Sequence, residues 1–262
     1  MTIIERMLPP KGLRVLVTAG AAGIGAVIAR AFLEAEAKVM VCDIDAAALA
    51  SFKAEHSGVF GDVCDVADEA AVTSLFAAAD RNLGGLDVLV NNAGIAGPTA
   101  GIADMALGDW KRTLDVNLTG MFLCTRAAVP ALKQSSKAGI INLSSVAGRL
   151  GYAYRSPYST SKFGVVGFTQ TLAKELGPDG IRVNAILPGI VRGDRIDRVF
   201  AARAEATGSS VEAVRAAGLK NVSLRTMVEA DDMAAMALHL CSPLGQRISG
   251  QALSICGNVE NI

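Results

Sequence analysis

Three side chains in the middle of this 262-residue chain could together move a proton. Tyr158 and Lys162 stand four residues apart, and Ser145 precedes the tyrosine by thirteen positions. Residues four apart on a helix share one face, so the ammonium would lie beside the phenol and favour the phenolate. A tyrosine base that works near neutral pH needs its pKa lowered by roughly three units from ~10, about 4 kcal/mol. The alternative is an ordinary pair on a helix surface, and the rest of the chain must decide between the two.

A glycine-rich segment near the N-terminus predicts a dinucleotide site. Residues 17–25 read VTAGAAGIG, between an apolar run and a helical pattern. Glycines there let the backbone approach a pyrophosphate, which the amides of the next helix N-terminus would bind. Asp43 ends the second apolar run, where an acid bonds the adenosine ribose and repels a 2′-phosphate. Asp45 is the better candidate for capping the following helix. No Lys or Arg follows at Ile44 or lies in the glycine turn, which favours NAD over NADP.

The composition excludes several classes of protein. The chain is 51% hydrophobic and 19% charged, with 25 basic and 25 acidic residues. It has no basic block, which argues against a nucleic-acid partner. It has neither a run of eighteen apolar residues nor a signal peptide, so we expect a cytoplasmic protein without membrane contact. Five scattered cysteines and two histidines lack metal-ligand spacing, so we expect free thiols and no metal.

Apolar runs alternate with helical patterns along the chain, which predicts a parallel sheet covered on both faces. Strands are expected at residues 13–18, 38–43, 59–60, 86–91, 138–144, 182–187 and 252–256. Helices are expected at residues 24–36, 46–55, 69–83, 109–133, 157–176 and 230–241. This pattern indicates one Rossmann-like, doubly wound α/β domain over residues 1–262, a three-layer α/β/α structure with seven strands. A polar insertion at about 190–222 follows a strand, where ligands bind and lids form.

From about residue 13 to residue 257 the chain resembles the short-chain dehydrogenase/reductase family, in its single-domain form. The resemblance rests on several motifs at once, which makes it specific. In chain order they are Thr18 to Gly25, Asp65-Val66, Asn91-Asn92-Ala93-Gly94, Asn117 within Asp115-Val116-Asn117-Leu118, Ser145, Tyr158 to Lys162, Arg182-Val183-Asn184 and Pro188-Gly189.

The resemblance implies an oxidoreductase that moves hydride between a secondary alcohol and a nicotinamide, without a metal. Tyr158 would act as general base or acid, while Ser145 stabilises the reacting oxygen. Lys162 would lower the tyrosine pKa and hold the nicotinamide ribose, and Asn117 would hold a relay water. The residues implied for cofactor binding are Thr18, Gly20, Ala22, Gly23, Ile24, Gly25, Asp43, Ile44, Asp65, Val66, Asn92, Ala93, Gly94, Tyr158, Lys162, Pro188, Gly189 and Ile190.

Three positions depart from the family pattern. The first glycine of the cofactor turn is Ala19, so we predict a negative φ at that residue and intact cofactor binding. Gly193 replaces the threonine that approaches the nicotinamide amide, so the amide needs another partner. The family's C-terminal Asp-Gly-Gly is Cys256-Gly257-Asn258, and the role of that segment stays open.

The substrate is less well defined by the sequence. Arg192, Arg195 and Arg198 lie in the insertion. The segment 149–155, with Tyr152, Tyr154 and Arg155, and residues 95–101 should form the other pocket walls. We expect Tyr154, Arg192 and Arg195 to contact substrate. A basic wall would select an anionic or polyhydroxylated molecule, but arginines on a solvated helix face are the better explanation of the pattern. Sugars or polyols, hydroxy acids and 3-hydroxyacyl groups are the candidates.

The expected helix at 157–176 is apolar on every side over residues 163–168, which favours burial against a second subunit. We therefore expect a homodimer or homotetramer, as is common in the family. Three other functions remain open. They are a catalytically idle NAD-binding regulator, a 3-oxoacyl reductase-like enzyme that uses NADPH, and an isomerase or epimerase that retains its cofactor.

Overall fold

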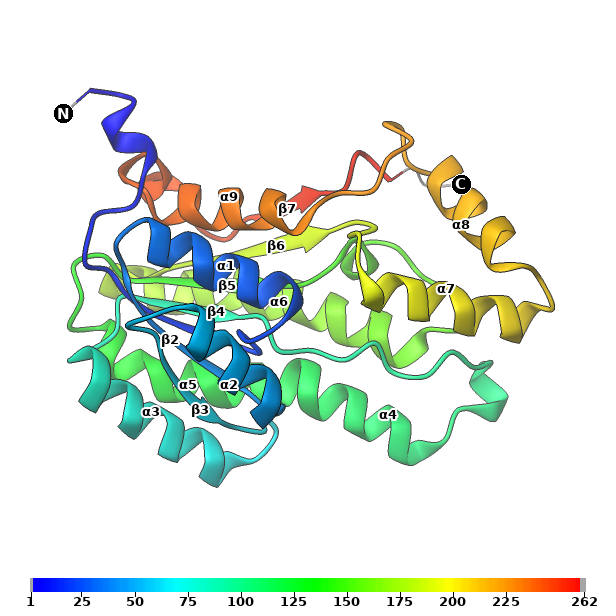
Figure 1. Cartoon of the computed structure of the whole chain (residues 1–262), viewed down its shortest axis with the longest axis horizontal. Coiled ribbons are helices and arrows are strands. Elements are labelled where there is room, and N and C mark those ends of the chain that lie inside the picture. Colours follow the sequence, from blue (N-terminus) through cyan, green and yellow to red (C-terminus); the bar gives the residue numbers. More distant parts are fainter. Residues whose placement is uncertain (1, 260–262) are drawn as a thin grey trace.

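The computed structural model describes residues 2–259, which form a parallel sheet between two layers of helices (Figure 1). The sheet order is β3-β2-β1-β4-β5-β6-β7, and every neighbouring pair is parallel. The predicted seven-stranded, doubly wound α/β fold is therefore confirmed. The strands are β1 (Arg14–Thr18), β2 (Lys38–Asp43), β3 (Phe60–Val63), β4 (Val88–Asn91), β5 (Gly139–Leu143), β6 (Arg182–Pro188) and β7 (Ala252–Ile255).

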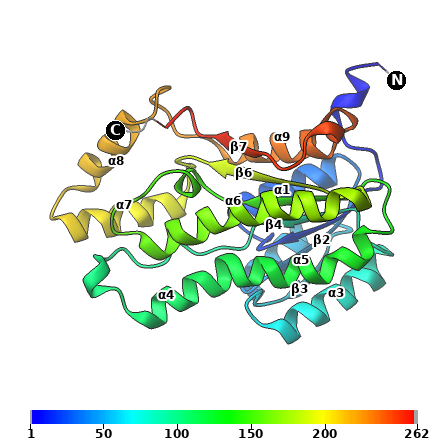
Figure 2. The same ribbon diagram turned by 180° about the vertical axis from the view of Figure 1, so that it is seen from behind.

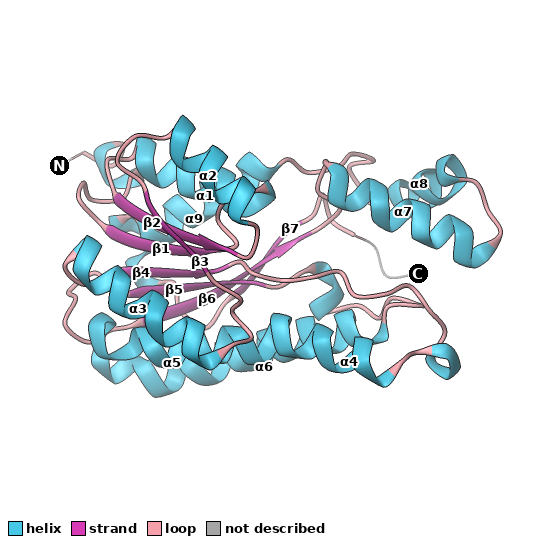
Figure 3. Ribbon diagram, turned by 60° about the horizontal axis from the view of Figure 1, so that its bottom comes forward, coloured by secondary structure: helices cyan, strands magenta, loops and turns pink. Residues whose placement is uncertain are grey.

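Helices cover both faces of the sheet (Figures 2 and 3). One face carries α1 (Gly23–Glu34), α2 (Ala46–Glu55) and α9 (Ala230–Cys241). The other carries α3 (Glu69–Leu83), α5 (Gly120–Leu132) and α6 (Ser156–Leu176). Figure 3 shows that α4 (Leu107–Leu114), α7 (Asp194–Thr207) and α8 (Val211–Lys220) extend beyond the carboxyl ends of the strands.

The strands are apolar because both of their faces are buried. In β1, Val15, Leu16 and Val17 are each 0% exposed. Leu16 packs into the core on the α3 and α5 side, while Val15 and Val17 pack into the core on the α1 and α9 side. Side chains that alternate between the faces of a strand thus pack into two separate cores, one under each helical layer.

A chain of buried amides ties the middle of the sheet to the helices behind it. The Asn91 side chain in β4 donates to Asn142 in β5 at 2.9 Å and to Thr125 in α5 at 3.0 Å. Asn142 in turn donates to Thr169 in α6 at 2.9 Å. Buried hydrogen bonds of this kind fix relative positions because breaking one leaves a desolvated polar group. The register of α6, which carries Tyr158, is held to the sheet in this way.

Two predicted elements differ from the observed ones. The expected helix at 109–133 is α4 and α5 joined by a π-helical turn, Asp115–Thr119, which contains Asn117. Such turns insert one extra residue and are frequent at functional sites. The strand expected at 59–60 is β3, Phe60–Val63, and the insertion folds into α7 and α8. Within residues 2–259, no helix combines the length and the apolarity needed to cross a membrane.

Candidate active site

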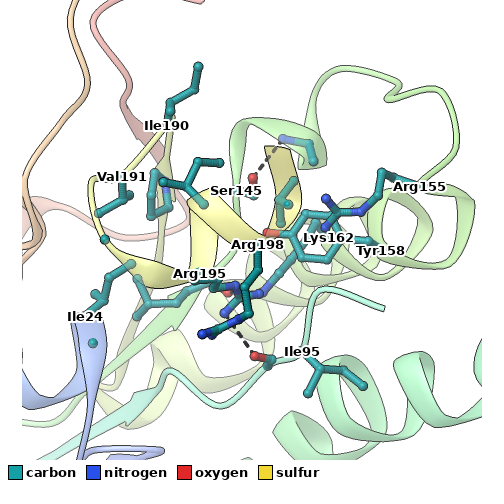
Figure 4. A pocket seen from close by; sticks show the side chains of 18 of the residues that line it. Ile24, Ile95, Ser145, Arg155, Tyr158, Lys162, Ile190, Val191, Arg195 and Arg198 are labelled. Atoms are coloured by element: carbon teal, nitrogen blue, oxygen red, sulfur yellow. Dashed lines mark hydrogen bonds between the residues drawn. The ribbon is translucent and has the colours of Figure 1, made fainter. Parts of the chain in front are cut away.

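A cavity of about 1740 Å³ lies at the carboxyl ends of the strands, under α7 (Figure 4). A pocket for one small molecule measures roughly 300–1,000 Å³, so this one has room for two ligands. Most of the site residues that the sequence predicts line it. They are Ala22, Gly23, Ile24, Asp43, Ile44, Asp65, Val66, Asn92, Ala93, Gly94, Ser145, Tyr158, Lys162, Pro188, Gly189, Ile190, Arg192 and Arg195.

Five predicted residues do not line the cavity. Thr18, Gly20 and Gly25 lie behind its wall, where they shape the glycine turn, and Asn117 is 0% exposed under the floor. Tyr154 is 42% exposed and lies outside the lining, whereas its neighbours Tyr152 and Arg155 line the cavity. Of the side chains expected in the wall at residues 149–155, Tyr152 and Arg155 therefore line the cavity, and Tyr154, which we expected to contact substrate, does not.

Tyr158, Lys162 and Ser145 come together at the cavity floor (Figure 4). Tyr158 and Lys162 lie in the first turns of α6, and the Lys162 nitrogen is 5.8 Å from the centroid of the tyrosine ring. Ser145 follows β5, and its oxygen accepts a hydrogen bond from the Ala147 amide at 3.1 Å. That bond occupies a lone pair and does not use the Ser145 hydroxyl hydrogen, which can be donated to Tyr158 or to a ligand in the cavity.

The surroundings of Tyr158 lower its pKa. Burial is the largest single contribution and raises the pKa of the phenol. Lys162, then Arg195, the Ser145 hydrogen bond and Arg155 together outweigh burial, so the pKa of Tyr158 falls below its ordinary value near ~10. A lowered pKa is what a tyrosine needs to accept a proton near neutral pH.

Lys162 is buried, 3% exposed, and burial lowers the pKa of its ammonium to about 8 against the opposing effect of Tyr158. The ammonium donates one hydrogen bond, to the Leu143 carbonyl at 2.7 Å. An ammonium carries three hydrogens, so two remain for a ligand in the cavity. Gly94 lies close by, because a Cβ built on it would be 3.5 Å from the Lys162 nitrogen.

Asn117 is bonded on every side of its amide group. Its oxygen accepts from the Ile95 amide at 2.7 Å, and its nitrogen donates to the Ile95 carbonyl and to Ser161, both at 3.0 Å. Ser161 itself donates to the Tyr158 carbonyl at 2.7 Å. Asn117 therefore joins the loop after β4 to the helix that carries the tyrosine. Sequence reasoning missed Ser161, although its place beside Lys162 in the motif was a usable signal.

The glycine turn corrects one prediction. Ala19 has φ 47°, in the left-handed region, and not the negative φ that we expected. The Asn92 side chain donates to the carbonyls of Thr18 and Ala19 at 3.0 and 2.9 Å, which holds the turn in place. A Cβ on Gly25 would lie 2.2 Å from the Ala19 carbonyl oxygen. The close approach of α1 to this turn therefore fixes a strained conformation at an alanine.

Asp43 ends β2 at the far end of the cavity and is 9% exposed. Its carboxylate accepts from the amides of Ala21 at 3.2 Å and Asp45 at 3.1 Å. Asp45 caps α2 by accepting from the next two free amides, as predicted. Asp43 is thus not needed as a cap, and its carboxylate retains lone pairs for a ribose.

These residues fit a nicotinamide dinucleotide. The amide end of α1 is open, since nothing lies within 4 Å of a Cβ built on Gly23. At the other end, a Cβ on Gly94 would crowd the Asn117 side-chain oxygen at 3.2 Å, so a larger residue there would have to displace the Asn117 amide. Asp43 and Lys162 supply a ribose acceptor and ribose donors at opposite ends of one continuous cavity.

The family model for short chain dehydrogenases matches residues 14–204. The chain belongs to this family. It is therefore an oxidoreductase that acts on CH–OH donors and binds a nicotinamide cofactor. The 2-dehydro-3-deoxy-L-rhamnonate dehydrogenase (NAD(+)) of Sphingomonas sp. (strain SKA58) is 36% identical over 184 residues, 70% of this chain and 74% of that protein.

Two solved structures are similar over nearly the whole chain. A single-residue variant of actinorhodin polyketide ketoreductase with NADPH has a TM-score of 0.90 and 33% identity, and the match covers 96% of this chain and 98% of that one. An NAD+-bound xylitol dehydrogenase has a TM-score of 0.90 and 29% identity, and that match covers 94% and 98% of the two chains. The relatives thus include users of both cofactors.

Proposed function

We propose that this protein is an NAD-dependent dehydrogenase that interconverts a secondary alcohol and its ketone, with Tyr158 as the general base or acid. The observation that carries the proposal is the set of Tyr158, Lys162 and Ser145 on one cavity whose opposite end is closed by the carboxylate of Asp43. The substrate classes that we consider are sugars or polyols, hydroxy acids and 3-hydroxyacyl groups.

The chain's own groups would handle the proton. In the oxidation direction, Tyr158 takes the proton of the substrate hydroxyl, and its lowered pKa makes the phenolate available. Ser145 donates its free hydrogen to the same oxygen and stabilises charge that develops there. The nicotinamide, when bound, accepts the hydride from the carbinol carbon.

Lys162 would then return the tyrosine to its starting state by passing on the proton. Both amide hydrogens of Asn117 are already donated, so a relay water at this residue has to donate to its oxygen. The cofactor would be held by the predicted residues on the cavity wall, with Ile190 near the nicotinamide in place of the missing threonine at Gly193.

The choice of NAD rests on Asp43. Its buried carboxylate would accept from the ribose hydroxyls and would repel a 2′-phosphate. The alternative is an NADPH-dependent ketoreductase, which is favoured by the structural similarity to a ketoreductase with NADPH. An idle NAD-binding regulator is disfavoured because Asn117, Ser145, Tyr158 and Lys162 are all present.

The assembly also belongs to the proposal. Phe163 on α6 and Phe122 on α5 are 47% and 43% exposed, and large apolar groups on neighbouring helices favour a subunit contact. We therefore infer a homodimer or homotetramer of one-domain subunits. The cytoplasm remains the compartment that we propose. Light scattering at micromolar concentration tests it, and a monomer would contradict it.

The decisive experiment is a screen for NAD+ reduction, followed by the absorbance of NADH, across polyols, hydroxy acids and 3-hydroxyacyl thioesters, repeated with NADP+. The proposal expects turnover with at least one secondary alcohol and a higher kcat/KM with NAD+. Better turnover with NADP+ would favour the ketoreductase. NAD+ binding without turnover on any alcohol would favour the regulator.

A further inference from the structure

The end of the cavity beyond Tyr158 is rich in arginine and poor in acid. Arginines from the segment 149–155 and from the insertion line it, and the acid at this end is Asp194, among the lining residues that the structure describes. The arginines are Arg149, Arg155, Arg192, Arg195, Arg198 and Arg203. Such a concentration of like charge is unfavourable unless something neutralises it.

One of these arginines has a carboxylate partner, and another is bonded to neutral groups that do not line the cavity. Arg192 forms an ion pair with Glu229 at 2.8 Å, and Arg149 donates to Ser254 at 3.1 Å and to the Ala252 carbonyl. The other four, Arg155, Arg195, Arg198 and Arg203, have no carboxylate partner within residues 2–259. Arg215, on α8 of the same insertion, is by contrast paired with Asp197 at 2.6 Å.

Arg155 is the most enclosed of the four. Its guanidinium stacks over the Tyr158 ring, 4.6 Å from the centroid, and one nitrogen donates to the Ala96 carbonyl at 2.9 Å. Its Nε is buried and has no hydrogen-bond partner in the part of the chain that is described. Only one of its donor groups is therefore used, beside the residue that would contact the reacting oxygen.

Arg195 and Arg203 approach this place from α7. Figure 4 shows Arg195 and Arg155 on opposite sides of Tyr158 and Lys162. Arg195 donates to the Gly94 carbonyl at 3.0 Å, a neutral partner. Burial lowers the pKa of Arg155, and the nearby Arg195 and Arg203 lower it further. Burial raises the pKa of Tyr152, which therefore stays neutral at this end and does not offset the charge.

We propose that the substrate carries an anionic group, a carboxylate or a phosphate, which Arg155 and Arg203 bind beside Tyr158. Guanidinium groups match both anions through paired N–H donors, and they gain most where water is excluded. The anion would also offset the mutual repulsion of the arginines. This assignment rests on the proposed alcohol oxidation, and among the candidate substrates it favours hydroxy acids and phosphorylated alcohols over neutral polyols.

The test measures binding without turnover. Calorimetric titration of the protein–NAD+ complex uses malonate, inorganic phosphate and the neutral malonamide as probes. We expect at least one anion to bind wild type, and Arg155→Gln and Arg203→Gln each to weaken it about ten- to hundredfold, the loss of a charge-assisted hydrogen bond. Arg215→Gln removes the same charge outside the cavity and should leave binding within about twofold.

The outcomes separate the sources of the anion. Stronger binding of malonate identifies a carboxylate, and stronger binding of phosphate identifies a phosphate ester. Equal binding of malonamide, no anion binding to wild type, or unchanged binding in both variants would overturn the proposal. An equal loss of NAD+ affinity in the variants would also overturn it, because the arginines would then serve the cofactor pyrophosphate.

A kinetic comparison distinguishes failure of the anion site from failure of the proposed alcohol oxidation. With 3-hydroxybutyrate and its methyl ester as substrates, the acid should lose about ten- to hundredfold more kcat/KM than the ester in Arg155→Gln, because the effect of this variant on the pKa of Tyr158 is common to both substrates. Turnover that is equal on acid and ester in wild type would leave an alcohol dehydrogenase without the anion site. Anion binding without turnover on any alcohol would support the anion site and contradict the proposed alcohol oxidation. Should Arg155→Gln fail to fold, Arg155→Lys and Arg203→Gln carry the same comparison.

Discussion

Replacing Ala19 by glycine should stabilise the protein. At φ 47°, a residue with a Cβ is strained by about 1–2 kcal/mol, and glycine is not. Glycine also makes the unfolded chain more flexible, which costs about 0.4–1 kcal/mol. The difference is a net gain of up to about 1.6 kcal/mol, with a midpoint of about 0.8 kcal/mol. In a chain of this length, a gain of that size raises Tm by about 1–4 °C.

The cofactor affinity should hardly change in Ala19→Gly. The backbone of the turn is fixed by the Gly20 amide, which donates to the Cys42 carbonyl at 2.9 Å, and by the two bonds from Asn92. These bonds involve no atom of the Ala19 side chain. The turn therefore keeps its shape, and we expect the Kd for NAD+ to stay within about twofold.

The assay is thermal unfolding with and without NAD+, together with titration calorimetry. Ala21→Gly is the matched control, because it makes the same chemical change two residues later, where φ is not positive. Ala21 also packs against the core, so its replacement should lower Tm. A fall in Tm for both variants would refute the claim that Ala19 is strained.

Three further predictions concern the site and the fold. Tyr158→Phe should keep the Kd for NAD+ within about threefold and reduce kcat by at least ~100-fold, the loss expected for a general base; near-normal turnover would exclude Tyr158 from that role. Asp43→Asn removes the charge that would repel a 2′-phosphate, so the kcat/KM ratio of NADP+ to NAD+ should rise at least ~tenfold; an unchanged ratio would place the discrimination elsewhere. Burial raises the pKa of Asp87, but hydrogen bonds from Arg14 and Ser135 outweigh it and leave the pKa lowered. Asp87 therefore stabilises the fold above the unfolded pKa near ~4, and this contribution disappears as pH falls through the folded value. The stability difference between wild type and Asp87→Asn in urea should accordingly be larger at neutral pH than in acid below the folded pKa; a constant difference would contradict this.

The fold could be predicted from the sequence because its signals are local. The run at residues 15–17 is apolar on both faces, which is typical of a parallel strand covered by helices on two sides. The π-helical turn at Asp115–Thr119 was not predictable in this way. One inserted residue does not disturb the helical pattern enough to be seen, although it sets the position of Asn117.

The site was predictable where a motif gives both residue type and spacing. Tyr158 and Lys162 lie together as their spacing implied, because residues four apart on a helix return to the same face, and Ser145 lines the same cavity as the family resemblance implied. The φ of Ala19 was not, because it depends on contacts from Gly25 and from Asn92, which lies far along the chain. The local preference of an alanine for negative φ is overridden at Ala19 because residues far along the chain fix the turn.

The arginines show why a motif alone underdetermines the chemistry of its tyrosine. The same burial that isolates Tyr158 lowers the pKa of Lys162 to about 8, so the lysine charge weakens within the range where the base must work. Guanidinium groups keep their charge throughout that range, and both Arg155 and Arg195 lower the pKa of Tyr158. Arg195 is delivered by α7, a segment outside the sheet and its helical layers. The pKa of Tyr158 therefore depends on the position of α7. An anion bound by these arginines would reduce their effect on the pKa of the phenol. Substrate charge and proton transfer are thus linked through the same side chains.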